Sequence, residues 1–184
     1  MRAGFTLIET LVTISLIGLA ISVAAVNFTT TSRNERVTNA AERVRQVIAQ
    51  AKANALSGVK DCRACGADVT QGYACGTGDS ALQGWLVTFT QNTDPTPDEF
   101  TIEGVCSNTA YPGGTQTTFL SKNENLPDGV EMTYSGSLDS ILFRVSGGGT
   151  YVLPVLGAGW SRQIIFTQGA TSRSITVNST GSVQ

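Results

Sequence analysis

The stretch GFTLIETLVTISLIGLAISVAAVNF, Gly4 to Phe28, decides the fold of this 184-residue chain. Between Glu9 and Arg33 lie 23 uncharged residues, Thr10 to Ser32, among which Leu, Ile, Val and Ala predominate and Pro is absent. About 20 mostly apolar residues are enough for a helix to cross the core of a bilayer. The stretch therefore predicts a transmembrane helix.

A cleaved secretory signal peptide is the alternative interpretation of this segment. Such a peptide has a basic start, an apolar run of roughly 7 to 15 residues and a cleavage site of small residues. Ala20-Ile21-Ser22 and Ser22-Val23-Ala24 imitate that cleavage site, but the apolar run is longer and Glu9 lies near its beginning. Length and charge favour a segment that stays in the membrane.

The residues at the start of the apolar run form a specific motif. Gly4-Phe5-Thr6-Leu7-Ile8-Glu9 follows a short leader, Met1-Arg2-Ala3, with one basic residue. This combination resembles the prepilin signature of type IV pilins and type II secretion pseudopilins. The resemblance implies that a prepilin peptidase cleaves between Gly4 and Phe5 and methylates the new amino group of Phe5.

Glu9 is the one charge close to the apolar run on its amino-terminal side. A charged side chain at the bilayer centre costs roughly 2.5 to 3.5 kcal/mol, and such residues usually mark a functional pairing. In proteins with this signature, the carboxylate meets the amine of a neighbouring subunit's first residue, here Phe5, when a filament assembles. A glutamate that merely lies among lipid head groups is the structural alternative.

Residues 31 to 57 are expected to continue the helix. Apolar residues alternate there in steps of four and three, which places them on one helix face: Val37, Ala41, Val44, Ile48, Ala51 and Ala55. Gly58 supplies a stop after Ser57. A break near Asn27 to Ser32, where Thr and Asn accumulate, is the alternative that would give two helices.

After Gly58, short runs rich in Val, Ile, Phe, Tyr and Thr alternate with turn clusters, which is the pattern of a two-sheet β domain. Strands are expected at residues 84–90, 99–105, 115–120, 129–134, 140–145, 149–155, 162–167 and 173–177. Pro154 favours an edge position or a bulge for the sixth. The predicted fold class is α+β, a long N-terminal helix packed on a C-terminal antiparallel domain of two sheets.

Four segments follow from these patterns. Residues 1–4 form the leader, residues 5–28 the transmembrane half of the helix, residues 29–57 its amphipathic half, and residues 58–184 a periplasmic β domain. Counting positive charges on the two sides of the apolar run does not decide its orientation. The prepilin resemblance places the N-terminus in the cytoplasm and the β domain outside the inner membrane.

Three stretches of the β region resemble a narrower group, the GspH/FimT/FimU minor pilins and pseudopilins. They are Gly84-Trp85-Leu86-Val87-Thr88-Phe89, then Phe143 to Gly149, and Arg173 to Asn178 followed by Gly181. The resemblance implies a structural subunit of the initiating or tip complex of a type IV pilus or a type II secretion pseudopilus. Its partners would be other pilins, the prepilin peptidase and, before assembly, the lipid of the inner membrane.

Two other roles within this resemblance stay open, a major pilin and a DNA-uptake pilin. DNA-binding members carry a basic Gly-Arg-x-Arg motif near the C-terminus, whereas this sequence has Gly181-Ser182-Val183-Gln184 there. The formal net charge is −2, and Arg162 and Arg173 make a thin basic patch. Nucleic acid is therefore not an expected partner.

The sequence offers little for enzymatic chemistry, and we expect neither catalysis nor a cofactor. The chain has no His, which removes Ser-His and Cys-His nucleophile pairs and the commonest zinc ligand. Asp94, Asp98 and Glu99 lie in a Pro-rich segment without the spacing of an EF-hand. A solvated turn is the expected structure there, and no metal site is predicted.

Four cysteines, Cys62, Cys65, Cys75 and Cys106, fit an oxidising compartment and structural disulfides. They allow three pairings. If residues 84–90 and 99–105 form a hairpin, Cys75 and Cys106 lie at the same end of it. This favours Cys75 with Cys106 and Cys62 with Cys65.

Overall fold

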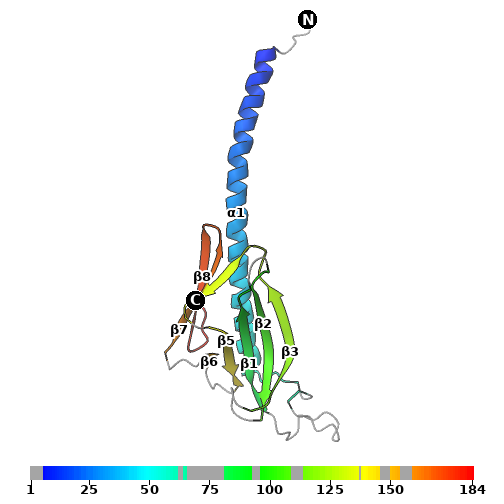
Figure 1. Ribbon diagram of the computed structural model, residues 1–184, viewed down its shortest axis with the longest axis vertical. Helices are drawn as coiled ribbons and strands as arrows, with labels where there is room; N and C mark the ends of the chain where they lie inside the picture. Colours follow the sequence, from blue (N-terminus) through cyan, green and yellow to red (C-terminus); the bar gives the residue numbers. More distant parts are fainter. Residues whose placement is uncertain are drawn as a thin grey trace.

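One helix and eight strands make up the described part of the chain (Figure 1). The computed structural model describes residues 6–61, 64–65, 81–92, 96–108, 114–136, 138–145, 150–153 and 159–184, and within these it leaves out the side chains of residues 23–27 and 151–153. Gly4, Phe5, Cys62, Cys75, Asp94 and Pro154 lie outside this description.

Helix α1 (Leu7–Leu56) is continuous over 50 residues, about 75 Å at 1.5 Å per residue. It runs through Asn27 to Ser32 without interruption, so the alternative of two helices is wrong. Ser57 is its C-cap, and Gly58 follows with φ +64°, a conformation that favours glycine. The predicted stop at this point is confirmed.

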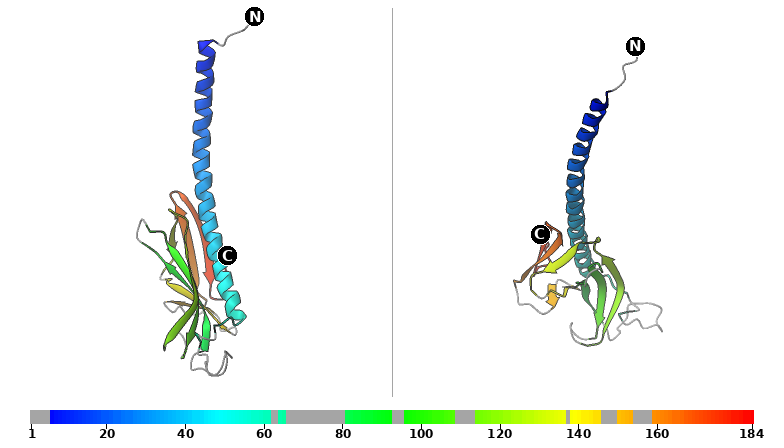
Figure 2. Two further views of the ribbon diagram at one scale, coloured as in Figure 1. Left: turned by 90° about the vertical axis from the view of Figure 1, so that its right-hand side faces the viewer. Right: turned by 45° about the horizontal axis from the view of Figure 1, so that its top comes forward.

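The first half of α1 extends away from the β domain (Figures 1 and 2). Among the described residues, no helix is both long enough and apolar enough to cross a membrane. The span predicted for residues 5–28 includes residue 5 and the side chains of residues 23–27, which lie outside the description. It stays a prediction.

The strands form two antiparallel sheets. The first has the order β3-β2-β1-β5-β6 and the second β4-β7-β8. Their bounds are β1 (Ala81–Thr90), β2 (Glu99–Ser107), β3 (Gln116–Asn125), β4 (Glu131–Tyr134), β5 (Ser140–Arg144), β6 (Thr150–Leu153), β7 (Ser161–Gln168) and β8 (Thr171–Asn178). This confirms the α+β fold class and a strand in each expected place.

Strand β3 is longer than predicted, because it continues through the polar residues Ser121 to Asn125. These residues pair with β2 as far as Glu99, and the Thr101 hydroxyl donates to the Asn123 side chain at 2.7 Å. As an edge strand of its sheet, β3 exposes most of its side chains. It therefore lacks the apolar alternation by which a half-buried strand is recognised.

The main core lies between α1 and the two sheets. The helix face predicted from the spacing is confirmed, since all of its six residues are buried: Val37, Ala41, Val44, Ile48, Ala51 and Ala55. From the first sheet Val87, Phe100 and Ile141 face this helix side, and from the second Ile164 and Phe166. Both sheets therefore share one core with helix α1.

Gly84 allows β1 and β5 to pair closely. A Cβ atom on Gly84 would lie 2.1 Å from the backbone oxygen of Phe143, so no larger residue fits without a backbone shift. The pairing of β1 with β2 also shifts register between Leu82 and Gly84. The next residue, Trp85, is buried and packs edge-on against Phe119, with ring centroids 5.6 Å apart.

Candidate assembly site

The helix begins beside the predicted processing site. Thr6 is the N-cap of α1, and its hydroxyl oxygen accepts a hydrogen bond from the backbone N–H of Glu9 at 3.4 Å. The spacing Thr-x-x-Glu is that of a capping box, a signal by which the sequence itself marks the start of the helix. Glu9 lies in the first helical turn and is exposed.

From this first turn onward, the helix carries large apolar side chains that no other part of the described chain buries. Their exposed fractions range from 53% at Val12 to 78% at Leu7. The segment of α1 that carries them, Leu7 to Phe28, is here called the apolar half. Its described large apolar residues are Leu7, Ile8, Leu11, Val12, Ile14, Leu16, Ile17, Leu19, Ile21 and Phe28. Such a surface is too large and continuous for a chain that stays alone in water.

The hydroxyl groups of the apolar half are satisfied within the helix. Thr10 donates to the Leu7 carbonyl at 2.8 Å and Ser15 to the Leu11 carbonyl at 2.8 Å. Thr13 and Ser22 make equivalent bonds one turn back. Because no water is available in a hydrocarbon core, hydroxyl groups that bond their own helix suit an apolar environment.

The second half of α1 is fixed to the β domain at the end far from the apolar half. Lys52 Nζ donates to the Thr180 carbonyl at 3.1 Å and to the Gly181 carbonyl at 3.3 Å. The Asn178 side-chain oxygen holds the same turn by accepting from the backbone N–H groups of Thr180 and Ser182. The helix and the β domain are thus joined by polar contacts as well as by the core.

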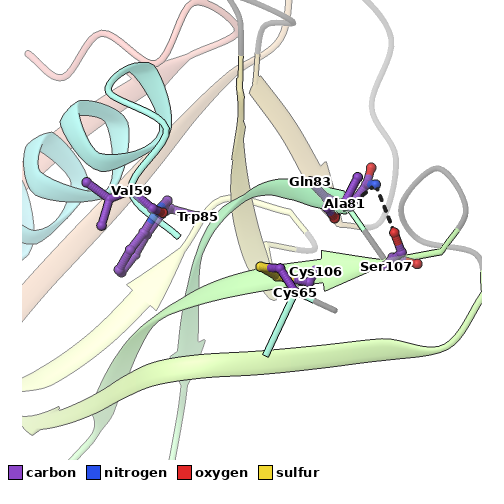
Figure 3. Close-up of a disulfide and its surroundings, with 7 residues drawn as sticks. All are labelled: Val59, Cys65, Ala81, Gln83, Trp85, Cys106 and Ser107. Carbon is purple, nitrogen blue, oxygen red and sulfur yellow. Dashed lines mark hydrogen bonds between the residues drawn. A yellow bond between two sulfur atoms is a disulfide. The ribbon is translucent and has the colours of Figure 1, made fainter. Parts of the chain in front are cut away.

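The structure pairs Cys65 with Cys106, so the favoured pairing of Cys75 with Cys106 is wrong (Figure 3). The Cα atoms are 5.2 Å apart, and both residues are buried. Trp85 Nε1 donates to the Val59 carbonyl at 3.0 Å, so the segment after α1 contacts strand β1 of the sheet to which Cys106 belongs. The sequence prediction rested on the ends of the β1–β2 hairpin, which do not show this contact.

The pairing of Cys62 with Cys65 is wrong for the same reason, since Cys65 is already bonded. Cys62 and Cys75 lie outside the described residues. They are the two cysteines of the sequence that remain for a second disulfide.

Asp98 is buried and does not form the solvated turn that we expected. One carboxylate oxygen accepts the N–H of Asn92 at 2.8 Å and the other that of Met132 at 2.6 Å. It thereby links the end of β1 with the start of β4, one strand from each sheet. Burial raises the pKa of Tyr134 above its ordinary value, and the carboxylates of Asp139 and then Asp98 add to this shift.

The other residues considered for binding do not converge. Within the described ranges, no group of three or more Cys, Asp and Glu side chains could hold a metal ion. Arg162 lies opposite Val177 and Arg173 opposite Phe166, so four strand residues, about 13 Å, separate the two arginines along the sheet. They do not make a compact basic patch.

One long helix, half of it uncovered, and two antiparallel sheets packed on its other half define a pilin-like arrangement. Residues 1–25 match the family model described as the prokaryotic N-terminal methylation motif. The match supports a type IV prepilin-like protein that a prepilin peptidase processes, with a structural role and a membrane anchor. Searches of curated proteins and of solved structures found no match.

Proposed function

We propose that this chain is a minor pilin or pseudopilin, a structural subunit of the initiating or tip complex of a type IV pilus or a type II secretion pseudopilus. The observation that carries the proposal is the uncovered apolar half of α1, which begins within the prepilin motif and has Glu9 in its first turn. The three stretches of the β domain that resemble minor pilins support the narrower role.

Before assembly, the apolar half lies in the inner membrane and the β domain lies in the periplasm. Prepilin peptidase removes residues 1–4 and methylates the amine of Phe5. On assembly, the apolar half leaves the lipid and packs against helices of other subunits. The hydrophobic cost of this exchange is small, because neighbouring helices are as apolar as lipid tails.

Glu9 supplies the specific contact of assembly. A carboxylate within the apolar half is costly in lipid unless it is paired. The Phe5 amine of a neighbouring subunit is a cation of the right size and depth, since Glu9 lies one helical turn from Phe5 in the same sequence. Pairing removes the cost for both groups and fixes the axial register of two subunits.

The first prediction is that Glu9→Val blocks entry into filaments while membrane insertion stays intact. The variant loses the carboxylate that pairs with the amine and gains an apolar side chain that lipid accepts. Immunoblots of sheared filaments and of the membrane fraction measure the two pools. Loss of the leader and methylation of Phe5 are checked by mass spectrometry of the N-terminal peptide.

Glu35→Gln is the matched control, because Glu35 is an exposed acid on the same helix beyond the apolar half. It should enter filaments as the unchanged chain does. Normal incorporation of Glu9→Val would refute the role of Glu9. Subunit counts in the sheared filaments separate a minor from a major pilin, since a minor pilin is a small fraction of the total.

A further inference from the structure

Three arginines lie at the junction between the apolar half and the β domain. The turn between β7 and β8 packs beside α1 there, with Arg33 Nη1 3.6 Å from the position of a Cβ atom on Gly169. Arg36 Nη1 donates to the Asp128 carbonyl at 3.5 Å, in the turn before β4. Figure 1 shows both turns at the end of the domain nearest the apolar half.

Arg173 belongs to the same end, because it lies on β8 two residues after the strand leaves this turn. Arg33, Arg36 and Arg173, here called the arginine collar, are all exposed. Gln168 Nε2 also donates to the Asp128 carbonyl, at 3.2 Å, which holds the two turns together. The arginines of the collar therefore lie on one surface, where α1 and the two turns are joined by hydrogen bonds.

No arginine of the collar forms an ion pair with a residue that the structure describes. Arg45 pairs with Glu42 and Lys122 with Glu124, and neither ion pair involves the collar. Three exposed acids lie at this junction. Glu35 adjoins Arg36 in the sequence, Asp128 contacts Arg36 through its backbone carbonyl, and Glu131 begins strand β4 after that turn. The guanidinium groups keep free donors for an external anion.

The position of the collar indicates what that anion is. Phe28, 76% exposed, is five residues before Arg33, which is about 7.5 Å along the helix. No acidic side chain lies between Glu9 and Glu35. A bilayer that covers the apolar half places its head groups at this depth, where arginine binds phosphate through two parallel hydrogen bonds.

We infer that the arginine collar binds the phosphate groups of anionic phospholipids while the subunit waits in the membrane. The inference rests on the proposed function, because it needs the apolar half to lie in lipid. It adds a lipid preference that the N-terminal motif does not contain. Release of these head groups becomes part of the step by which the subunit leaves the membrane.

The test uses the full chain in nanodiscs of phosphatidylcholine mixed with phosphatidylglycerol. Mass spectrometry of the lipids that stay bound after mild detergent extraction measures the enrichment of phosphatidylglycerol. A basic residue near an anionic surface is worth about a fivefold change in binding. We expect several-fold enrichment for the unchanged chain and its loss when Arg33, Arg36 and Arg173 are all replaced by Gln.

Arg43→Gln with Lys60→Gln is the matched control, since both residues are exposed cations of the helix region away from the junction. This variant should keep the enrichment. The fluorescence of the buried Trp85 and Trp160 confirms that each variant is folded. Equal enrichment with and without the collar, or none in the unchanged chain, would overturn the inference.

Two further results separate the remaining explanations. If inorganic phosphate at matched ionic strength displaces phosphatidylglycerol, the collar is a site for free phosphate and the inference fails. If the chain does not stay in nanodiscs at all, the proposed membrane stage fails first. A chain that stays in nanodiscs without lipid preference refutes the collar alone.

Discussion

At the scale of single residues, glycines show where backbones approach too closely for a side chain. Gly84 and Gly104 both lie within strands, and a Cβ atom on Gly104 would lie 2.2 Å from the ring of Phe119. Gly18, in the apolar half, has nothing within 4 Å of such an atom. These positions differ in their neighbours although the residue is the same.

Gly84→Ala should therefore destabilise the protein while Gly18→Ala should not. At Gly84 the obstacle is the Phe143 backbone, which moves only with strand β5, and overpacking costs about 1 to 3 kcal/mol. At Gly18 alanine gains about 1 kcal/mol of helix propensity. Denaturant unfolding of the full chain in detergent measures both, and equal stabilities of the two variants would contradict this account.

The residue scale is also where prediction from sequence was weakest. Asp98 looked like a loop residue among prolines, yet it is buried because two backbone N–H groups from distant segments converge on it. The partner of Cys65 depended on where the segment after α1 lies, and the hydrogen bond from Trp85 to Val59 joins that segment to the first sheet. Neither contact produces a periodic pattern in the sequence from which it could be predicted.

At the scale of elements, sequence patterns predicted the helix face and the strands wherever buried residues recur at regular intervals. The face of α1 from Val37 to Ala55 and the places of the strands followed from spacing and turn residues. The end of β3 did not, because Ser121 to Asn125 form an exposed edge and carry no apolar signal. The two-sheet arrangement followed from the resemblance and from strand count rather than from any single strand.

Ile48→Ala should test how much the helix face contributes. Ile48 is fully buried between α1 and the sheets, and removing such a side chain costs about 2 to 5 kcal/mol of the unfolding free energy. Ala49→Ser, its exposed neighbour, should change this free energy by less than about 0.5 kcal/mol. Fluorescence of Trp85 and Trp160 during denaturant unfolding reports both, and a loss at position 49 as large as that at 48 would refute the assigned face.

At the scale of the whole molecule, the Cys65–Cys106 bond joins the segment after the helix to the first sheet across 41 residues of sequence. Closing a loop of that length lowers the entropy of the unfolded chain by an amount worth about 4 kcal/mol. The bond therefore stabilises the attachment of the helix to the domain.

Cys65→Ser, Cys106→Ser and the double variant should all lose about the same stability, roughly 4 kcal/mol, because each removes the same bond. Denaturant unfolding of the full chain in detergent measures the three losses, and non-reducing peptide mapping identifies the bond directly. Additive losses in the double variant would show that Cys65 and Cys106 have different partners.

The continuous helix also decides how the molecule responds to force. A pull along the axis of α1, applied at the apolar half, reaches the β domain through the buried face from Val37 to Ala55, about 27 Å of contact. This geometry loads the core in shear, so its side chains share the tension and do not detach one after another. Lys52 and the turn that it holds lie at the far end of the loaded region, where they resist sliding of the helix out of the domain. A pull on the apolar half is therefore transmitted to the β domain as a whole.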